Sequence, residues 1–175
     1  SIRARAPTGP AVDSPDYANW NRFPVGTTVR RRSVTGGGDS TVTSVDTLTL
    51  TAKKDDVLTV SRQNTTDRTG DSYKVANPPV PTNYYRQFSL PQGMTAEDFV
   101  KPSRNAKAVG TEDVTVLGKT YKATVYTWSN PTEGGRTDVK AWLSDEFPGR
   151  VIRQEMTAPG SQGKMVEEVI ELKIP

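Results

Sequence analysis

The stretch from Gly118 to Met156 constrains the fold more than any other part of the chain. It contains three runs of strand-forming residues separated by two breaks. The first break combines Asn130-Pro131 with Gly134-Gly135, and the second is Pro148-Gly149. Proline presets φ and glycine accepts positive φ, so both breaks favour a reversal of the chain. We therefore predict a three-stranded antiparallel meander in this stretch.

The rest of the chain repeats this pattern. Runs rich in Thr and Val at 27–35, 41–52, 57–63 and 164–174 are typical of strands, and polar or glycine-rich turns separate them. Short helices are predicted near residues 15–22 and 95–101, where Ser14 and Thr95 are suitable capping residues. We expect a mainly β fold of roughly nine to eleven strands. One curled antiparallel sheet should form a half-barrel or flattened barrel, with the two short helices covering it.

Length and composition favour a single domain. The chain has 175 residues, which we divide into a flexible N-terminal arm at 1–13 and a single antiparallel β domain at 14–175. No apolar run approaches the roughly 18 residues that a membrane-spanning helix needs, so no transmembrane segment is expected. The chain begins at Ser1 rather than Met, which is typical of a mature or trimmed protein.

The sequence contains no histidine and no cysteine. This excludes Cys or His nucleophiles, a Ser-His-Asp triad, zinc sites of the usual Cys/His type and any disulfide bond within the chain. The acidic pair Asp145-Glu146 precedes the Pro148-Gly149 turn. Neighbouring strand residues point to opposite faces, however, and no third oxygen ligand lies at a useful spacing. We therefore expect a protein that is not an enzyme and holds no metal ion or cofactor.

The run Arg30-Arg31-Arg32 lies within a predicted strand. Because side chains alternate along a strand, Arg30 and Arg32 point to one face and Arg31 points to the other. A nucleic-acid surface needs clustered cations with aromatic side chains on a single face. The run therefore does not indicate nucleic-acid binding.

Aromatic residues are the best candidates for a ligand surface. Tyr17 and Trp20 are three residues apart and share one face of the first predicted helix. In the meander, residues 121–128 and 139–144 place bulky side chains on both faces of the sheet. Such a sheet is either covered on both sides or curled around a ligand. The candidate ligand-binding residues are Tyr17, Trp20, Phe23, Tyr126, Trp128 and Trp142. The competing interpretation is that these side chains pack in the core, which is the favoured interpretation for Trp142.

The segment from Trp142 to Arg153 reads Trp-Leu-Ser-Asp-Glu-Phe-Pro-Gly-Arg-Val-Ile-Arg. It resembles a hairpin of uncharacterised exported bacterial proteins, whose upstream part commonly carries a Trp, a Gly and a strand, as at Trp20, Gly26 and Val29 here. These proteins are distantly similar to the lipoprotein carriers LolA and LolB. The resemblance covers almost the whole chain and implies an incomplete antiparallel barrel with helices closing its concave face. It brings no catalytic residues.

This resemblance and the aromatic helices imply a non-enzymatic binding module of the bacterial cell envelope. Its concave sheet would hold an apolar or amphipathic ligand, such as a lipid, and envelope proteins are further candidate partners. The expected location is extracytoplasmic, periplasmic or secreted, after removal of a signal peptide. The alternative is a structural or interaction protein that binds envelope proteins through a sheet edge or through the Asn77–Pro81 loop. Carriers of acyl chains have a strongly apolar inner face, whereas threonine and charged residues occupy many strand faces here.

Overall fold

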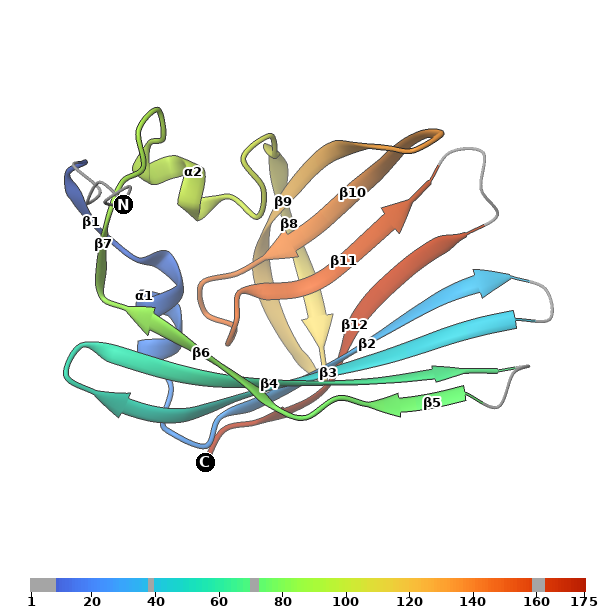
Figure 1. Ribbon diagram of the computed structural model, residues 1–175, viewed down its shortest axis with the longest axis horizontal. Coiled ribbons are helices and arrows are strands. Elements are labelled where there is room, and N and C mark those ends of the chain that lie inside the picture. The colour runs from blue at the N-terminus through green and yellow to red at the C-terminus, as the bar shows by residue number, and fades with distance from the viewer. Residues whose placement is uncertain (1–8, 38–39, 70–72, 159–162) are drawn as a thin grey trace, which may run out of the picture.

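The computed structural model describes residues 9–37, 40–69, 73–158 and 163–175. Within these residues the chain forms twelve strands and two short helices (Figure 1). The helices are α1 (Pro15–Asn21) and α2 (Ala96–Val100). The strands are β1 (Ala11–Asp13), β2 (Thr28–Gly37), β3 (Ser40–Lys54), β4 (Val57–Arg68), β5 (Tyr73–Ala76), β6 (Val80–Tyr85), β7 (Gln87–Ser89), β8 (Lys107–Val116), β9 (Lys119–Thr132), β10 (Gly135–Leu143), β11 (Val151–Thr157) and β12 (Lys164–Lys173).

Ten of these strands form one antiparallel sheet. Nine follow the order β5-β4-β3-β2-β12-β11-β10-β9-β8, and β6 also pairs with β4. Within the described residues the sheet ends at β8 on one side and at β5 and β6 on the other, so it is not closed into a barrel. Its two halves, β2–β6 and β8–β11, diverge toward one end of the molecule (Figure 1). This confirms the prediction of a mainly β fold with a curled antiparallel sheet.

The predicted meander is present as β9, β10 and β11. The position of Pro131 differs from the expectation, because it lies inside β9, opposite Arg136, and the chain reverses at 133–134. Proline is tolerated there because β8 pairs with β9 only as far as Thr127, which leaves the amide side of the strand open at residue 131. The second break is a longer loop at 144–150 between β10 and β11.

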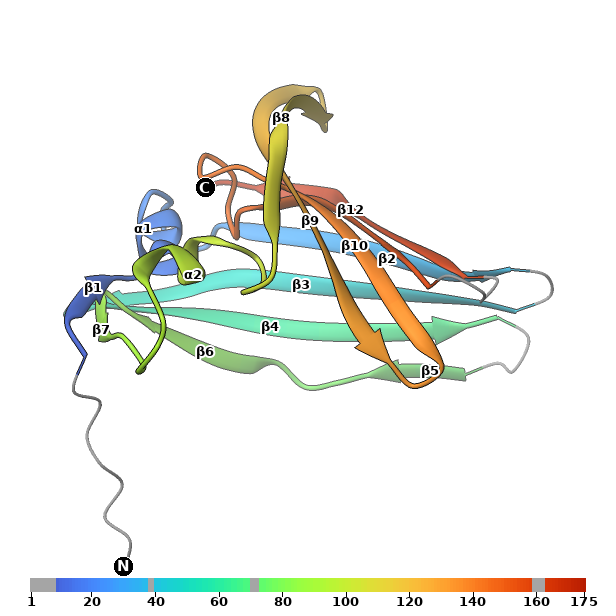
Figure 2. The ribbon, with the colours of Figure 1, turned by 90° about the horizontal axis from the view of Figure 1, so that it is seen from above.

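Both predicted helices are confirmed, and each begins at the expected cap. The Ser14 hydroxyl accepts a hydrogen bond from the Tyr17 amide at 3.2 Å, and Pro15 occupies the first turn. At α2, the Asp98 carboxylate accepts a hydrogen bond from the Thr95 amide at 2.9 Å. The two helices lie at the same end of the molecule (Figures 1 and 2).

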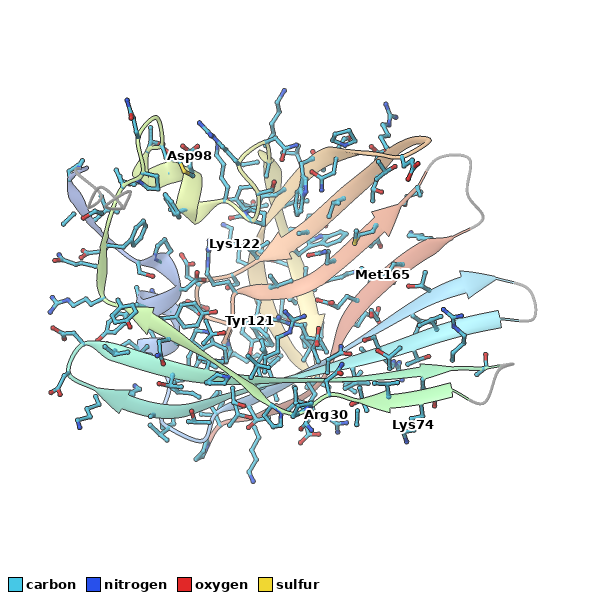
Figure 3. The ribbon with its side chains drawn as sticks, viewed as in Figure 1. Arg30, Lys74, Asp98, Tyr121, Lys122 and Met165 are labelled. Carbon is cyan, nitrogen blue, oxygen red and sulfur yellow. The ribbon has the colours of Figure 1, made fainter. Side chains whose placement is uncertain are left out.

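One main core joins the two halves of the sheet. Phe147, from the 144–150 loop, is fully buried and packs edge-to-face on Tyr121 with ring centroids 5.4 Å apart. Tyr121 lies in the middle of the molecule (Figure 3). The core draws on α1, on both halves of the sheet and on the 144–150 loop: Trp20, Val29, Leu50, Leu58, Val60, Tyr121, Ala123, Val125, Trp142, Phe147, Ile152 and Val169.

The N-terminal arm expected at 1–13 falls mostly on residues 1–8, which lie outside the described residues. From Ala11 to Asp13 the chain forms β1, which pairs with β7 in a separate two-stranded sheet. Among the described residues, no helix has the length and apolar character needed to cross a membrane.

Candidate functional site: a charged pocket under helix α1

The 144–150 loop holds α1 in place through Asn19. The Asn19 side chain is almost fully buried, and its Nδ2 donates to the carbonyl oxygens of Asp145 and Phe147, both at 2.9 Å. Its Oδ1 accepts from the Gly149 amide at 2.8 Å. All the hydrogen-bonding groups at the end of this amide are therefore used, and they fix the position of α1 and of Trp20 beside the loop.

The same loop is attached to α2 through Arg150. This residue has φ of +68° and is only 7% exposed, which is unusual for an arginine. Its guanidinium donates to the Asp145 carboxylate at 3.1 Å and to the carbonyl oxygen of Val100 at the end of α2. The loop thus connects both helices to the sheet.

A cavity of about 320 Å³ lies on the inner face of the sheet under α1. Its walls come from α1, from the 144–150 loop and from strands β2, β3, β4, β6, β11 and β12. The apolar part of the wall consists of Trp20, Leu48, Val60 and Val151. The ionisable side chains in the wall are Asp16, Arg31, Asp46, Arg62, Tyr84 and Glu167. We call this cavity the Arg31 pocket.

Strand register brings the charged residues together. Arg31 on β2 lies opposite Asp46 on β3, which in turn lies opposite Asn64 on β4. Directly opposite residues of antiparallel strands share a face, so all three side chains point to the same side of the sheet. Arg30 has the opposite orientation, lies on the outer side of the sheet (Figure 3) and pairs with Glu171 at 3.0 Å.

Arg31 is the least satisfied polar group in the pocket. Its Nε and Nη2 atoms are buried and have no hydrogen-bond partner among the described residues. Burial lowers the pKa of Arg31, and the charges of Glu167 and Asp46 oppose this shift. The guanidinium nevertheless stays charged, because arginine does not lose its proton in proteins. Gly149 lies against it, and a Cβ atom at that position would be 2.8 Å from Nη2.

Asp46, in contrast, has a full set of partners. Arg62 donates to its two carboxylate oxygens at 3.3 and 2.9 Å, and Asn64 donates to one of them at 2.9 Å. Burial alone would raise the pKa of Asp46, but the hydrogen bonds from Arg62 and Asn64 outweigh burial and lower it. Asp46 and Arg62 therefore form an ion pair that is already satisfied.

Glu167 and Tyr84 complete the polar wall. Burial raises the pKa of Glu167, and the positive charge of Arg31 opposes this rise. Burial also raises the pKa of Tyr84. Neither side chain accepts a hydrogen bond from Nε or Nη2 of Arg31, so these two buried donors have charged neighbours but no hydrogen-bonded partner among the described residues.

The structure does not bring the six predicted ligand-binding residues into one site. Trp20 is 2% exposed and lines the Arg31 pocket, while Tyr17 is half-buried against the main core and Phe23 is 9% exposed. Tyr126 lines a different cavity beside the 144–150 loop, and Trp128 lines a third one over β9–β11. The ligand-binding role of this set stays a prediction.

Trp142 is packed rather than open to solvent. It is 6% exposed, and its Nε1 donates to the Glu112 carboxylate at 2.7 Å. Lys140 lies over its ring, 4.8 Å from the centroid. These contacts agree with the packed interpretation favoured for Trp142 from the sequence.

Sequence reasoning did not select the charged residues of the pocket. The available signal was the alternation of side chains along a strand. Asp46 is two and four residues from Leu48 and Leu50, so it shares their face. Arg62 shares a face with Leu58 and Val60 in the same way. A charged residue in phase with buried apolar residues indicates a polar group on the inner face.

Comparisons with known proteins give a fold but no family. No protein-family model matches the chain, and no curated protein matches it. Among solved structures, a candidate exported protein with a YmcC-like fold from Bacteroides fragilis is similar, with a TM-score of 0.51 and 10% identity over 86% of this chain and 97% of that chain. A candidate lipoprotein from Parabacteroides distasonis has a TM-score of 0.48 and 11% identity over the same shares of the two chains. At these identities the likeness concerns the fold alone, and the similarity to LolA and LolB stays a prediction.

Proposed function

We propose that this chain is a non-enzymatic binding module of the bacterial cell envelope and that it holds an amphipathic ligand in the Arg31 pocket. The observation that carries the proposal is the pocket itself. It combines the apolar wall of Trp20, Leu48 and Val60 with a buried arginine that lacks hydrogen-bond partners among the described residues. Ligand sites are typically concave and largely apolar with a few polar groups that fix orientation.

The composition of the wall narrows the kind of ligand. A purely apolar molecule would cover Arg31 without offering it an acceptor, which leaves a buried charge unsatisfied. A small polar molecule would leave the exposed parts of Leu48 and Val151 without apolar contacts. An amphipathic molecule satisfies both parts of the wall, and a lipid or lipid fragment is the natural class.

Binding, rather than catalysis, is also favoured by the state of the acidic groups. The Asp46 carboxylate accepts hydrogen bonds from Arg62 and Asn64, which makes it a poor general base. The Bacteroides fragilis protein of similar fold is described as a candidate exported protein, which supports an extracytoplasmic location, periplasmic or secreted.

The proposal is tested with a fluorescent amphipathic probe, 11-dansylaminoundecanoic acid, and with its neutral methyl ester. We expect the anisotropy of the probe to rise when the protein is titrated in. Leu48→Trp should abolish this rise by filling the pocket, whereas Leu117→Trp should not, because Leu117 is 58% exposed on the β8–β9 turn. Absence of binding by both probes to the wild-type protein would overturn the proposal.

A second candidate function is an interaction protein that uses a sheet edge. The β8 strand forms one edge of the sheet, and Val109 on it is 59% exposed. Val80, in the 77–81 segment, is 60% exposed. An exposed edge can pair with a strand of a partner. This function predicts an envelope protein that binds the wild type and Leu117→Asp equally but does not bind Val109→Asp.

A further inference from the structure

We propose that the head group of the ligand is an oxyanion, a carboxylate or a phosphate, which binds the guanidinium of Arg31. This inference rests on the proposed function, because it specifies the chemistry of the ligand in the same pocket.

The first argument is the missing acceptor. The great majority of buried polar atoms in proteins have a hydrogen-bond partner, and leaving a charged one unpaired is especially costly. Arg31 has two such atoms, Nε and Nη2, and both lack a partner among the described residues. These two nitrogens lie on one edge of the planar guanidinium and match the two oxygens of a carboxylate or phosphate.

The second argument comes from the other charges that face the pocket. Asp46 is already bound by Arg62 and Asn64. Asp16 lines the pocket but is largely exposed to solvent, and neither Asp16 nor Glu167 accepts a hydrogen bond from Nε or Nη2 of Arg31. None of these carboxylates therefore supplies the acceptor that the Arg31 nitrogens need.

The third argument is that the surroundings are shaped around the guanidinium. Gly149 lies next to Nη2, and any Cβ there would approach it to 2.8 Å. The φ of Gly149 is +80°, which a glycine adopts without strain. The Trp20 ring flanks the same glycine. Because both nitrogens are closed off from solvent, the proposal requires the guanidinium to turn from Gly149 into the cavity, where the apolar tail of the ligand would lie along Leu48 and Val151.

The test uses a series of ligands that share one twelve-carbon tail. Dodecanoate, dodecyl phosphate, methyl dodecanoate and dodecyltrimethylammonium compete, below their micellar concentrations, with the neutral dansyl methyl ester. The variants are Arg31→Met and the matched control Arg32→Met, whose side chain lies on the opposite face of the same strand. Comparison of dodecanoate with dodecyl phosphate distinguishes a fatty acid from a phospholipid fragment as the source of the oxyanion.

We expect at least one oxyanion to bind the wild type and Arg32→Met roughly ten- to a hundredfold more tightly than methyl dodecanoate, the range for hydrogen bonds to a charged group. Arg31→Met should abolish this preference and still bind the neutral probe. Its melting temperature without ligand should equal or exceed that of the wild type, because the substitution removes a buried charge that lacks hydrogen bonds. A purely structural arginine would instead give a lower melting temperature.

The outcomes separate the two proposals. If the neutral probe binds the wild type but neither oxyanion is preferred, the oxyanion inference is wrong and the proposed function stands. If neither the acidic nor the neutral probe binds, the proposed function is wrong. Should Arg31→Met fail to fold, Arg31→Lys keeps the charge but loses the paired donors, and an unchanged oxyanion preference in that variant would also overturn the inference.

Discussion

Asn19 should contribute more to stability than any other polar side chain of α1. Its amide makes three hydrogen bonds to the 144–150 loop, at 2.9, 2.9 and 2.8 Å, and it is 2% exposed. Asn19→Ala removes all three and leaves the Gly149 amide and two carbonyl oxygens with fewer partners. At about 0.5–1.5 kcal/mol for each net hydrogen bond, the expected loss is about 2–4 kcal/mol.

Asn21→Ala is the matched control. Asn21 is the last residue of the same helix and is exposed; its backbone carbonyl accepts from Lys53, and its side chain makes no hydrogen bond among the described residues. Both substitutions replace Asn by Ala in a helix, so the gain in helix propensity is similar and largely cancels in the comparison. Urea unfolding, followed by tryptophan fluorescence and by circular dichroism, gives the free energy of unfolding of each variant.

A second substitution separates hydrogen bonding from packing. Asn19→Asp keeps the shape of the side chain and the acceptor for the Gly149 amide, but it places an oxygen against the carbonyl oxygens of Asp145 and Phe147. At neutral pH it should destabilise the protein at least as much as Asn19→Ala. The reasoning would be refuted if the free energies of unfolding of Asn19→Ala and Asn21→Ala differed by less than about 0.5 kcal/mol, the usual range for surface substitutions.

Three further predictions follow from burial, backbone geometry and charge. Trp142→Ala should lower the free energy of unfolding by about 3–5 kcal/mol, the usual loss for a buried large aromatic. Trp128 is only half-buried, so Trp128→Ala should lower the free energy of unfolding clearly less in the same urea titration. Gly149→Ala should lower the melting temperature more than Gly134→Ala, because both residues have positive φ (+80° and +88°) but only a Cβ at 149 meets a side chain, at 2.8 Å; equal shifts would contradict this. The lowered pKa of Asp46 means that its ionised form stabilises the folded state above the ordinary pKa of 3.8 and that this contribution is lost as pH falls through the lower folded-state value. Asp46→Asn should therefore lose less stability than the wild type on acidification below about pH 4, as measured by urea unfolding at a series of pH values.

The fold could be predicted because its signals are local. Ser14 and Thr95 begin helices through hydrogen bonds within one turn, and the glycine at 134 marks the reversal between β9 and β10. Pro131 shows the limit of such signals. Whether a proline stands in a turn or in a strand depends on where the neighbouring strand ends, and here β8 ends its pairing at Thr127.

The candidate site could be predicted only in part. Alternation tells which face a residue takes, and it correctly separates Arg31 from Arg30 and Arg32. It does not tell which residues of other strands lie opposite, because that depends on register. The pairing of β2 with β3 and β12 brings Arg31 near Asp46 and Glu167. These residues are far apart in the sequence, so a local sequence pattern cannot predict that they meet. The aromatic residues show a related limit, because a large apolar side chain serves equally well in a core and in a pocket wall.

The segment from Trp142 to Arg153, which carries the resemblance to exported bacterial proteins, has a physical role that explains its residue types. Its Asp145–Gly149 part supplies the backbone groups that bind Asn19 of α1. Arg150 ties the same loop to α2, and Phe147 fills the main core. Gly149 then leaves room for the guanidinium of Arg31 at the wall of the pocket. A substitution that breaks the contact between this loop and α1 should therefore also alter the pocket, so stability and ligand affinity are expected to change together in Asn19→Ala but separately in Arg31→Met.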